Sequence, residues 1–351
     1  MLTYCIGISV TKLWIYNGYK RITCSKKNEI QLKDRNKWIH EAIKLLLVDG
    51  EGQIFSRLEK IEIEIDIDET EAKGYCYCLK LDANGNPRTN DLIEFVLTKI
   101  VDYSLPKKLQ DEAKDFLDRT SSSSKILELE RRAKQLFVDL EKTGEFGEML
   151  LYILVQEILK LPQLISKMTL KTSGKLHYQG ADGIHVKYEE SDDSLSLYWG
   201  ESKMEKTVNN ALKHCFESLQ GFLLDAKGHD STQTRDLHLI SSNLIENTNN
   251  PKLEEILVRY FDLNDDLSNK LNYKGVCFVG FDDDEYPNSP LEKVTADLVA
   301  VFQNKIEKWL KTTSKHIKKH VDLEKFEIHV FIIPFPSVQE FRDHFLKMLG
   351  K

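Results

Sequence analysis

The chain has 351 residues, of which 41% are hydrophobic and 30% charged, and its formal net charge at pH 7 is −7. This composition is ordinary for a soluble globular protein, and the length suffices for two or three domains with a sizeable core. The negative charge excludes a general electrostatic affinity for nucleic acid, so DNA affinity would have to come from local basic patches. The sequence shows neither an apolar run long enough for a transmembrane helix nor a secretory signal. Its 6 cysteines match no zinc spacing, so we expect reduced thiols in a cytoplasmic protein.

Residues 1–120 predict an N-terminal α/β region. Isoleucines alternate with acidic residues over 61–68, which is the pattern of a half-exposed strand, and a second strand is expected over 74–81. Helices fit 36–48 and 90–103. Because this region carries no nuclease motif, we expect it to regulate the rest of the chain or to dock a partner protein.

A second unit, residues 121–351, begins at the run Ser121–Ser124, which we interpret as a boundary and a helix cap. Apolar residues at helical spacing predict helices over 126–141, 148–161, 207–224, 252–261, 291–319 and 338–349. Other apolar runs predict a hairpin over 180–203 and strands over 237–241, 275–281 and 326–333. Strands that alternate with helices in this way indicate an α/β fold class.

The predicted hairpin brings three charged side chains together. Its polar turn, Ser191–Ser194, predicts a register with Asp182 opposite Lys203, Ile184 opposite Glu201 and Val186 opposite Trp199. Because strand side chains alternate between faces, Asp182, Glu201 and Lys203 then share one face. His185 falls on the other face, where we expect it at the surface.

These charges have a chemical interpretation, because an apolar strand face that ends in charged groups is costly unless a metal or a substrate compensates them. Asp182 and Glu201 supply the carboxylate oxygens that Mg²⁺ prefers, and Mn²⁺ is expected to substitute for it. The metal would polarise a scissile phosphate, while Lys203 would orient water and stabilise charge on the phosphate oxygens. The pattern predicts a Mg²⁺-dependent phosphodiesterase.

The helix over 148–161 adds a third acidic residue to the predicted site. Glu148 lies at the N-terminal end of the apolar stripe of this helix, so its carboxylate should point at the metal. Glu145, one turn earlier, could be the metal ligand instead, or it could contact the ligands without binding the metal itself. Gln220 on the following helix could also contact the site.

Two clusters of lysines are candidates for DNA contact. The first surrounds the hairpin and consists of Lys167, Lys171, Lys175, Lys187, Lys203, Lys206 and Lys213. The second lies on the predicted helix over 291–319, beside Glu307, and consists of Lys305, Lys308, Lys311, Lys315, Lys318 and Lys319. Either cluster could instead be a solvated face, and for the second this interpretation is favoured.

The order of a helical glutamate, an aspartate and Glu-x-Lys resembles the PD-(D/E)xK nuclease superfamily, with Ala181 in place of the usual proline. More closely, residues 144–148, 180–183 and 200–203, together with the tail Phe331–Pro336, are similar to the HamA-type effector nucleases of Hachiman antiphage defence. The resemblance implies a restriction-endonuclease-like (PD-(D/E)xK) core and a bacterial DNase whose site consists of Glu148, Asp182, Glu201 and Lys203. It also implies a helicase partner, HamB, that keeps the nuclease inactive until the helicase senses abnormal DNA.

A function of a different class stays open on the sequence alone. The chain could be a non-catalytic subunit that uses a nuclease-like fold to bind DNA or to scaffold a helicase. The presence of Asp182, Glu201 and Lys203 favours catalysis over this alternative, because a site that no longer catalyses a reaction does not need to keep such residues.

Overall fold

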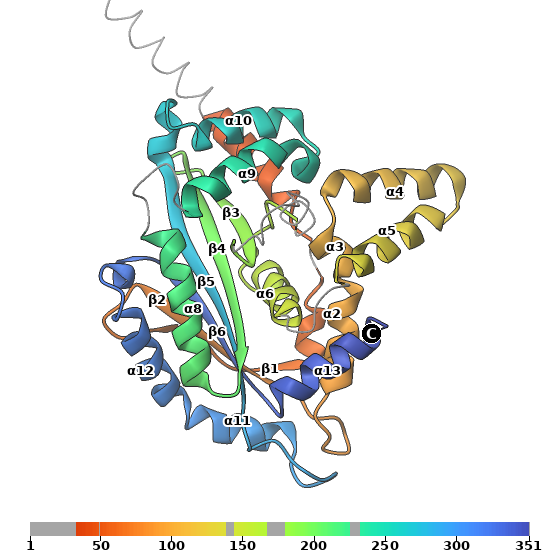
Figure 1. Cartoon of the computed structure of the whole chain (residues 1–351), viewed down its shortest axis with the longest axis vertical. Coiled ribbons are helices and arrows are strands. Elements are labelled where there is room, and N and C mark those ends of the chain that lie inside the picture. The colour runs from red at the N-terminus through yellow and green to blue at the C-terminus, as the bar shows by residue number, and fades with distance from the viewer. Residues whose placement is uncertain (1–32, 49, 138–143, 167–179, 225–231, 351) are drawn as a thin grey trace, which may run out of the picture.

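The structure is a computed structural model that describes residues 33–350, apart from 49, 138–143, 167–179 and 225–231 (Figure 1). In these residues six strands form one mixed sheet in the order β1-β2-β6-β5-β4-β3. Their bounds are Leu58–Asp66 for β1, Ala72–Leu79 for β2, Gly183–Glu189 for β3, Ser194–Glu205 for β4, Leu271–Asp282 for β5 and Ile328–Phe335 for β6. Parallel pairings in the middle lie between an antiparallel hairpin at each edge. The predicted α/β fold class is therefore confirmed.

The helices of the described residues alternate with these strands along the chain. Their bounds are Thr89–Thr98 for α2, Ile100–Ser104 for α3, Lys107–Thr120 for α4, Ser124–Gln135 for α5, Glu145–Glu157 for α6, Val208–Leu223 for α8, Thr232–Thr248 for α9, Pro251–Phe261 for α10, Thr295–Gln303 for α11, Ile306–Ile317 for α12 and Val338–Met348 for α13. A further helix covers 33–44, and short 3-10 helices cover Gln53–Ser56, Asp266–Lys270 and Leu323–Lys325. No helix in this part of the chain is both long and apolar enough to cross a membrane.

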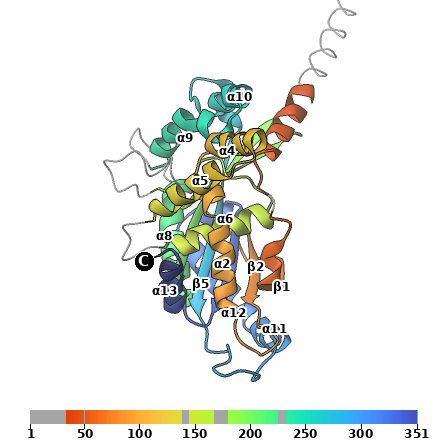
Figure 2. The same ribbon diagram turned by 90° about the vertical axis from the view of Figure 1, so that its right-hand side faces the viewer.

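Helices cover both faces of the sheet (Figures 1 and 2). α8 and α12 pack on one face, whereas α6, α2 and α13 lie on the other. Two strand glycines show this contrast, because a Cβ at Gly275 would meet Leu219 of α8 and a Cβ at Gly200 would meet Leu151 of α6. Residues of α6 therefore reach the sheet from the face opposite α8.

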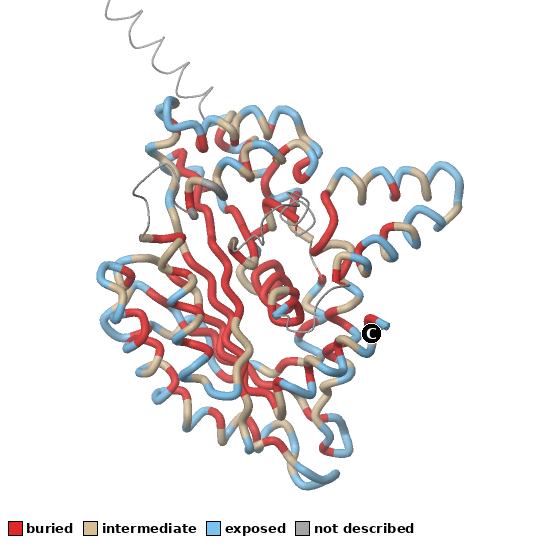
Figure 3. The backbone as a smooth tube through the Cα atoms, in the orientation of Figure 1, coloured by how far each residue is buried: buried red, intermediate tan, exposed pale blue. Residues whose placement is uncertain are grey.

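The core follows the central strands and α6 (Figure 3). Residues 275–281 of β5 and 330–335 of β6 are buried without interruption. This is the pattern of parallel strands that are covered on both faces, for which near-continuous apolar runs are typical. Burial of apolar surface stabilises the folded state by about 25 cal/mol per Å². The buried strands β5 and β6 therefore form a stable frame for the hairpin β3–β4.

The region before residue 120 is built into this same sheet. β2 pairs in parallel with β6, with Gly74 opposite Val330, and β1 extends the sheet by one further strand. α2 and α3 pack on α6. The sheet thus does not divide at residue 120, although the sequence predicts a separate N-terminal unit there. A parallel strand pairing joins segments far apart in sequence, which local patterns do not reveal.

Most predicted elements are confirmed, and the exceptions have local causes. Residues 237–241 belong to α9 and not to a strand, because Leu237, Ile240 and Leu244 recur at helical spacing. The predicted helix over 90–103 is divided between α2 and α3, and the one over 291–319 between α11 and α12. The rest of the predicted helix over 126–141, beyond α5, is described only through residue 137.

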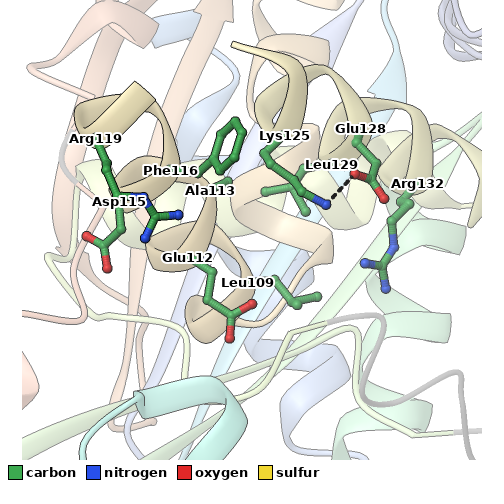
Figure 4. A pocket seen from close by; sticks show the side chains of 10 residues that line it. All are labelled: Leu109, Glu112, Ala113, Asp115, Phe116, Arg119, Lys125, Glu128, Leu129 and Arg132. Atoms are coloured by element: carbon green, nitrogen blue, oxygen red, sulfur yellow. Dashed lines mark hydrogen bonds and ion pairs between the residues drawn. The ribbon is translucent and has the colours of Figure 1, made fainter. Parts of the chain in front are cut away.

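The serine run forms the tip of a helical hairpin. α4, which the sequence did not predict, and α5 project together from the body of the molecule as an arm (Figure 1). Ser121 has a φ of 58°, which lets the chain reverse between the two helices. A groove of about 340 Å³ between them mixes apolar and charged side chains (Figure 4), and it is lined by Leu109, Glu112, Ala113, Asp115, Phe116, Arg119, Lys125, Glu128, Leu129 and Arg132.

Candidate active site

The register of the hairpin β3–β4 differs from the predicted one by two residues. Gly183 lies opposite Gly200, and Val186 lies opposite Leu197 instead of Trp199. A shift of two keeps every side chain on its predicted face, because strand side chains alternate with period two. The backbone N–H of Asp182 donates to the carbonyl of Gly200 over 2.8 Å. Asp182 therefore comes level with Glu201, and the predicted positions of Asp182 opposite Lys203 and of Ile184 opposite Glu201 are wrong.

The cause of this shift is the turn between the strands. Asp193 ends a four-residue loop, since Glu189 pairs with Ser194, and it has a left-handed φ of 56°. Its buried carboxylate accepts hydrogen bonds from the Tyr188 hydroxyl over 2.7 Å and the Tyr260 hydroxyl over 2.9 Å. Lys270 and Arg35 pair with the same carboxylate. These contacts place Asp193 in the loop, whereas the sequence pattern centred the turn one residue later.

Glu201 and Lys203 form an ion pair at the C-terminal part of β4. Lys203 Nζ lies 2.9 Å from Glu201 Oε2, and Glu201 is 3% exposed. Burial raises the pKa of Glu201, the charge of Asp182 raises it further, and the ammonium of Lys203 opposes both effects. Burial alone would lower the pKa of Lys203, but Glu201 and Asp182 outweigh it and raise that pKa. Lys203 is thus held as a cation beside two carboxylates.

Asp182 is fixed by the same strand. Its Oδ2 accepts a hydrogen bond from the backbone N–H of Ser202 over 2.8 Å. Ser202 lies between Glu201 and Lys203, so this bond joins the three predicted residues into one structural unit. The predicted convergence of Asp182, Glu201 and Lys203 on one region of the sheet agrees with this geometry.

Glu148 reaches this region from the other side of the sheet. It lies in the first turn of α6, where Gly147 permits a close approach to β4, because a Cβ there would come 3.0 Å from Ser202 Oγ. The hydroxyl of Tyr103 donates a hydrogen bond to Glu148 Oε2 over 2.8 Å. The charge of Glu148 also contributes to the raised pKa of Glu201. Sequence patterns gave no signal for Tyr103, which is an aromatic residue in a short helix.

The remaining predicted residues have different surroundings. Glu145 is buried, and its charge acts on Tyr103 together with those of Glu148 and Asp182. The amide of Gln220 donates to the carbonyl of Glu217 in its own helix over 3.3 Å, and no described contact joins it to Glu201.

His185 lies on the predicted face but not at the surface. Its side chain is fully buried, and Nδ1 donates to the carbonyl of Leu161 over 3.1 Å. Burial lowers the pKa of His185 to about 4. The expectation of an exposed histidine was wrong because α6 and residues 161–165 cover this face and edge of β3.

The site suits a hard divalent cation by its chemistry but is not a preformed cage. Among the described residues, no three His, Cys, Asp or Glu side chains stand close enough together to hold a metal ion. Mg²⁺ commonly takes one or two carboxylates and completes its coordination with water and phosphate oxygens. The carboxylates of Asp182 and Glu201 meet that requirement, with Glu148 nearby.

The two lysine clusters are partly neutralised. In the first, Lys187 pairs with Glu189 and Lys213 with Glu217, while Lys167, Lys171 and Lys175 lie outside the described residues. In the second, acidic partners neutralise Lys305, Lys311 and Lys318. Lys308 and Lys315 line a surface groove of about 390 Å³ on α12.

Comparison with known proteins adds one finding to this geometry. No individual curated protein matches the chain. A model of the HamA family, however, matches residues 54–349, which include every strand of the sheet and all four predicted site residues. The match extends over more than half of the sequence, from the edge strand β1 to the last helix. The chain therefore belongs to the HamA family, the protein family of the Hachiman antiphage defence system.

Proposed function

We propose that this protein is a metal-dependent nuclease that hydrolyses DNA phosphodiester bonds and acts as the effector of its defence system. The observation that carries the proposal is the ion pair between the partly buried Lys203 and the buried Glu201, with Asp182 hydrogen-bonded to the intervening Ser202 N–H. Burying charged groups costs free energy. Packing therefore does not explain why a lysine and two carboxylates lie together here. Membership in the HamA family supports the proposal.

The fold proposed for this function is a PD-(D/E)xK core. Its elements would be the hairpin β3–β4, the neighbouring strand β5 and the flanking helices α6 and α8. β4 carries Glu201 and Lys203, Asp182 immediately precedes β3, and α6 brings Glu148. This order along the chain, helical acid first and Glu-x-Lys last, matches the superfamily pattern that the sequence resembles.

Each residue has a role that its surroundings support. Asp182 and Glu201 would hold Mg²⁺ or Mn²⁺, with Glu148 nearby as a further carboxylate or as a ligand to bound water. When bound, the metal would supply Lewis-acid activation of the phosphodiester and of the attacking water. Lys203 would place a fixed positive charge where negative charge builds up on the phosphate oxygens. Its raised pKa keeps the ammonium protonated over the neutral pH range.

The proposal includes a helicase partner of the HamB type. The net charge of −7 makes capture of DNA by this chain alone inefficient, because non-specific DNA affinity comes mainly from cationic groups that neutralise phosphates. Acidic partners also occupy several lysines of the two clusters. A partner that delivers DNA and releases the nuclease on ATP-dependent remodelling would meet this need.

A second candidate function is a non-catalytic subunit that binds DNA or scaffolds the helicase. The observation that favours it is the lack of three described His, Cys, Asp or Glu side chains at metal-binding separation. The two functions differ in whether bond cleavage depends on Glu201.

Incubation with supercoiled plasmid tests the proposal, with the chain alone and with its helicase, in Mg²⁺ and in EDTA. We expect Mg²⁺-dependent cutting that Glu201→Gln abolishes and that the matched Glu189→Gln retains, because Glu189 is paired with Lys187 near the turn of the hairpin. Cutting in EDTA, or full activity of Glu201→Gln, contradicts the assignment. Binding without cutting by the wild type in every condition supports the non-catalytic subunit.

A further inference from the structure

Tyr103 joins the region before residue 120 to the candidate site. Its hydroxyl donates to Glu148 Oε2 over 2.8 Å, and its side chain has no exposed surface. Tyr103 belongs to α3, whereas Glu148 follows 45 residues later in the first turn of α6. The hydrogen bond therefore depends on how α3 packs on α6, and not on local chain geometry.

The ring of Tyr103 is held on two sides. Its centroid lies 5.5 Å from that of Tyr152 on α6 and 6.4 Å from that of Phe137, which follows α5. Tilted aromatic pairs at these separations are favourable beyond the area they bury. Packing thus fixes where the hydroxyl points, so that the ring can orient a more mobile partner.

The carboxylate of Glu148 can be oriented in this way, because its side chain is only partly buried and has several rotatable bonds. A hydrogen bond to Oε2 fixes the direction in which the rest of the carboxylate faces. The charges of Asp182 and Glu145 also act on the Tyr103 hydroxyl, which places that hydroxyl close to the other acids. Groups that donate hydrogen bonds to ligating carboxylates orient them and tune the affinity of the metal.

We propose that Tyr103 is a positioning residue, whose hydroxyl orients the carboxylate of Glu148 toward Asp182 and Glu201. This inference rests on the proposed function, because the orientation of Glu148 matters only where its carboxylate meets a metal or metal-bound water. It also places α3, from which the α4–α5 arm projects, in direct contact with the site. A region that the sequence assigned to regulation or to partner docking would then also contribute to metal binding.

The test compares Tyr103→Phe with wild type, since this change removes the hydroxyl and keeps the ring. We expect Mn²⁺ affinity, measured by electron paramagnetic resonance titration of the full chain, to fall about 10- to 100-fold. The Mg²⁺ concentration for half-maximal plasmid cutting should rise in parallel. The matched control is Tyr198→Phe, which removes a buried phenol that donates to Glu327 over 3.3 Å. That variant should keep the wild-type affinity for Mn²⁺.

A mutant cycle separates positioning from a general structural role. In a Glu148→Ala background, Tyr103→Phe should have no further effect on Mn²⁺ affinity, because Tyr103 acts through Glu148. If Tyr103→Phe does not fold, 3-fluorotyrosine can be placed at position 103 instead, because it keeps the hydrogen bond. Its fluorine NMR resonance should shift when Mg²⁺ is added to the otherwise wild-type chain. The same addition should cause no shift in the Glu148→Ala variant.

The outcomes distinguish this inference from the proposed function. If wild type binds Mn²⁺ and cuts DNA while Tyr103→Phe binds Mn²⁺ equally well, or the fluorine resonance ignores Mg²⁺, the positioning role is wrong and the nuclease stands. If wild type itself neither binds Mn²⁺ nor cuts, both are wrong. Equal losses from Tyr103→Phe in the wild-type and Glu148→Ala backgrounds also overturn the positioning role.

Discussion

The backbone N–H of Ser202 donates to Asp182 Oδ2 over 2.8 Å, which fastens the start of β3 to β4 between Glu201 and Lys203. A carboxylate in this position has two separable roles, as a hydrogen-bond acceptor for the fold and as a charge for the chemistry. A substitution that removes only the charge and one that removes both the charge and the acceptor should therefore be equally inactive. They should differ in folding stability.

Asp182→Asn and Asp182→Ala should both abolish DNA cutting, because neither keeps the negative charge. Asp182→Asn retains an acceptor for the Ser202 N–H, so its free energy of unfolding should stay close to that of wild type. Asp182→Ala leaves that N–H without this partner and should lose about 1–3 kcal/mol. Urea unfolding and plasmid assays measure the two effects. A fully active Asp182→Asn would remove Asp182 from the proposed site.

Lys203→Met should reduce the single-turnover rate of cutting by about 100- to 1,000-fold, the size of effect seen when one preorganised charge-stabilising group is removed. Metal binding should be largely retained, because the carboxylates of Asp182 and Glu201 remain. Quench-flow kinetics and Mn²⁺ titration on the same preparation test both statements. Loss of Mn²⁺ binding together with activity would instead show that Lys203 maintains the structure of the site.

Asp193 should make folding stability depend on acid pH. Burial alone would raise its pKa, but hydrogen bonds from Lys270, Tyr188 and Arg35 outweigh burial and lower the pKa from 3.8 to about 2. A depressed carboxylate pKa adds stability above the unfolded pKa, and this stability is lost as the pH falls from 3.8 through about 2.

The variant Asp193→Asn isolates this contribution. It should be less stable than wild type at pH 7, and the difference should shrink as the pH falls through the window given by the two pKa values. Thermal melts from acid to neutral pH measure it. The control is Asp192→Asn, which changes the exposed neighbour in the same loop. A difference between wild type and Asp193→Asn that does not vary with pH would contradict the assignment.

The chain should form a stable complex with a HamB-type helicase, the partner proposed for it, and cutting should be suppressed in that complex until ATP and DNA remodel the contact. The net charge of −7 underlies this expectation, since it disfavours DNA capture by the chain alone. Co-purification, followed by plasmid assays with and without ATP, tests it. Equal cutting rates for the free chain and the mixture under every condition would rule out gating and leave the nuclease assignment intact.

The faces of the hairpin are determined by the sequence itself. Alternation with period two puts Asp182, Glu201 and Lys203 on one face and His185 on the other, and a two-residue change of register does not alter this. Helical spacing likewise predicts most of α6, although α6 begins at Glu145 and the predicted helix at 148. It also predicts a helix over 207–224, which corresponds to α8. Such features depend only on residues that are close in the sequence, so the local sequence pattern is enough to predict them.

Features that depend on distant segments were decided by the tertiary structure alone. The register follows from Asp193, whose partners Arg35, Tyr260 and Lys270 lie 158, 67 and 77 residues away in the chain. The parallel pairing of β2 with β6 merges the region before residue 120 with the rest, and the packing of α3 on α6 brings Tyr103 to Glu148. Each of these contacts forms because folding buries a polar group that must find a partner wherever the chain supplies one, and no local pattern records where that partner is.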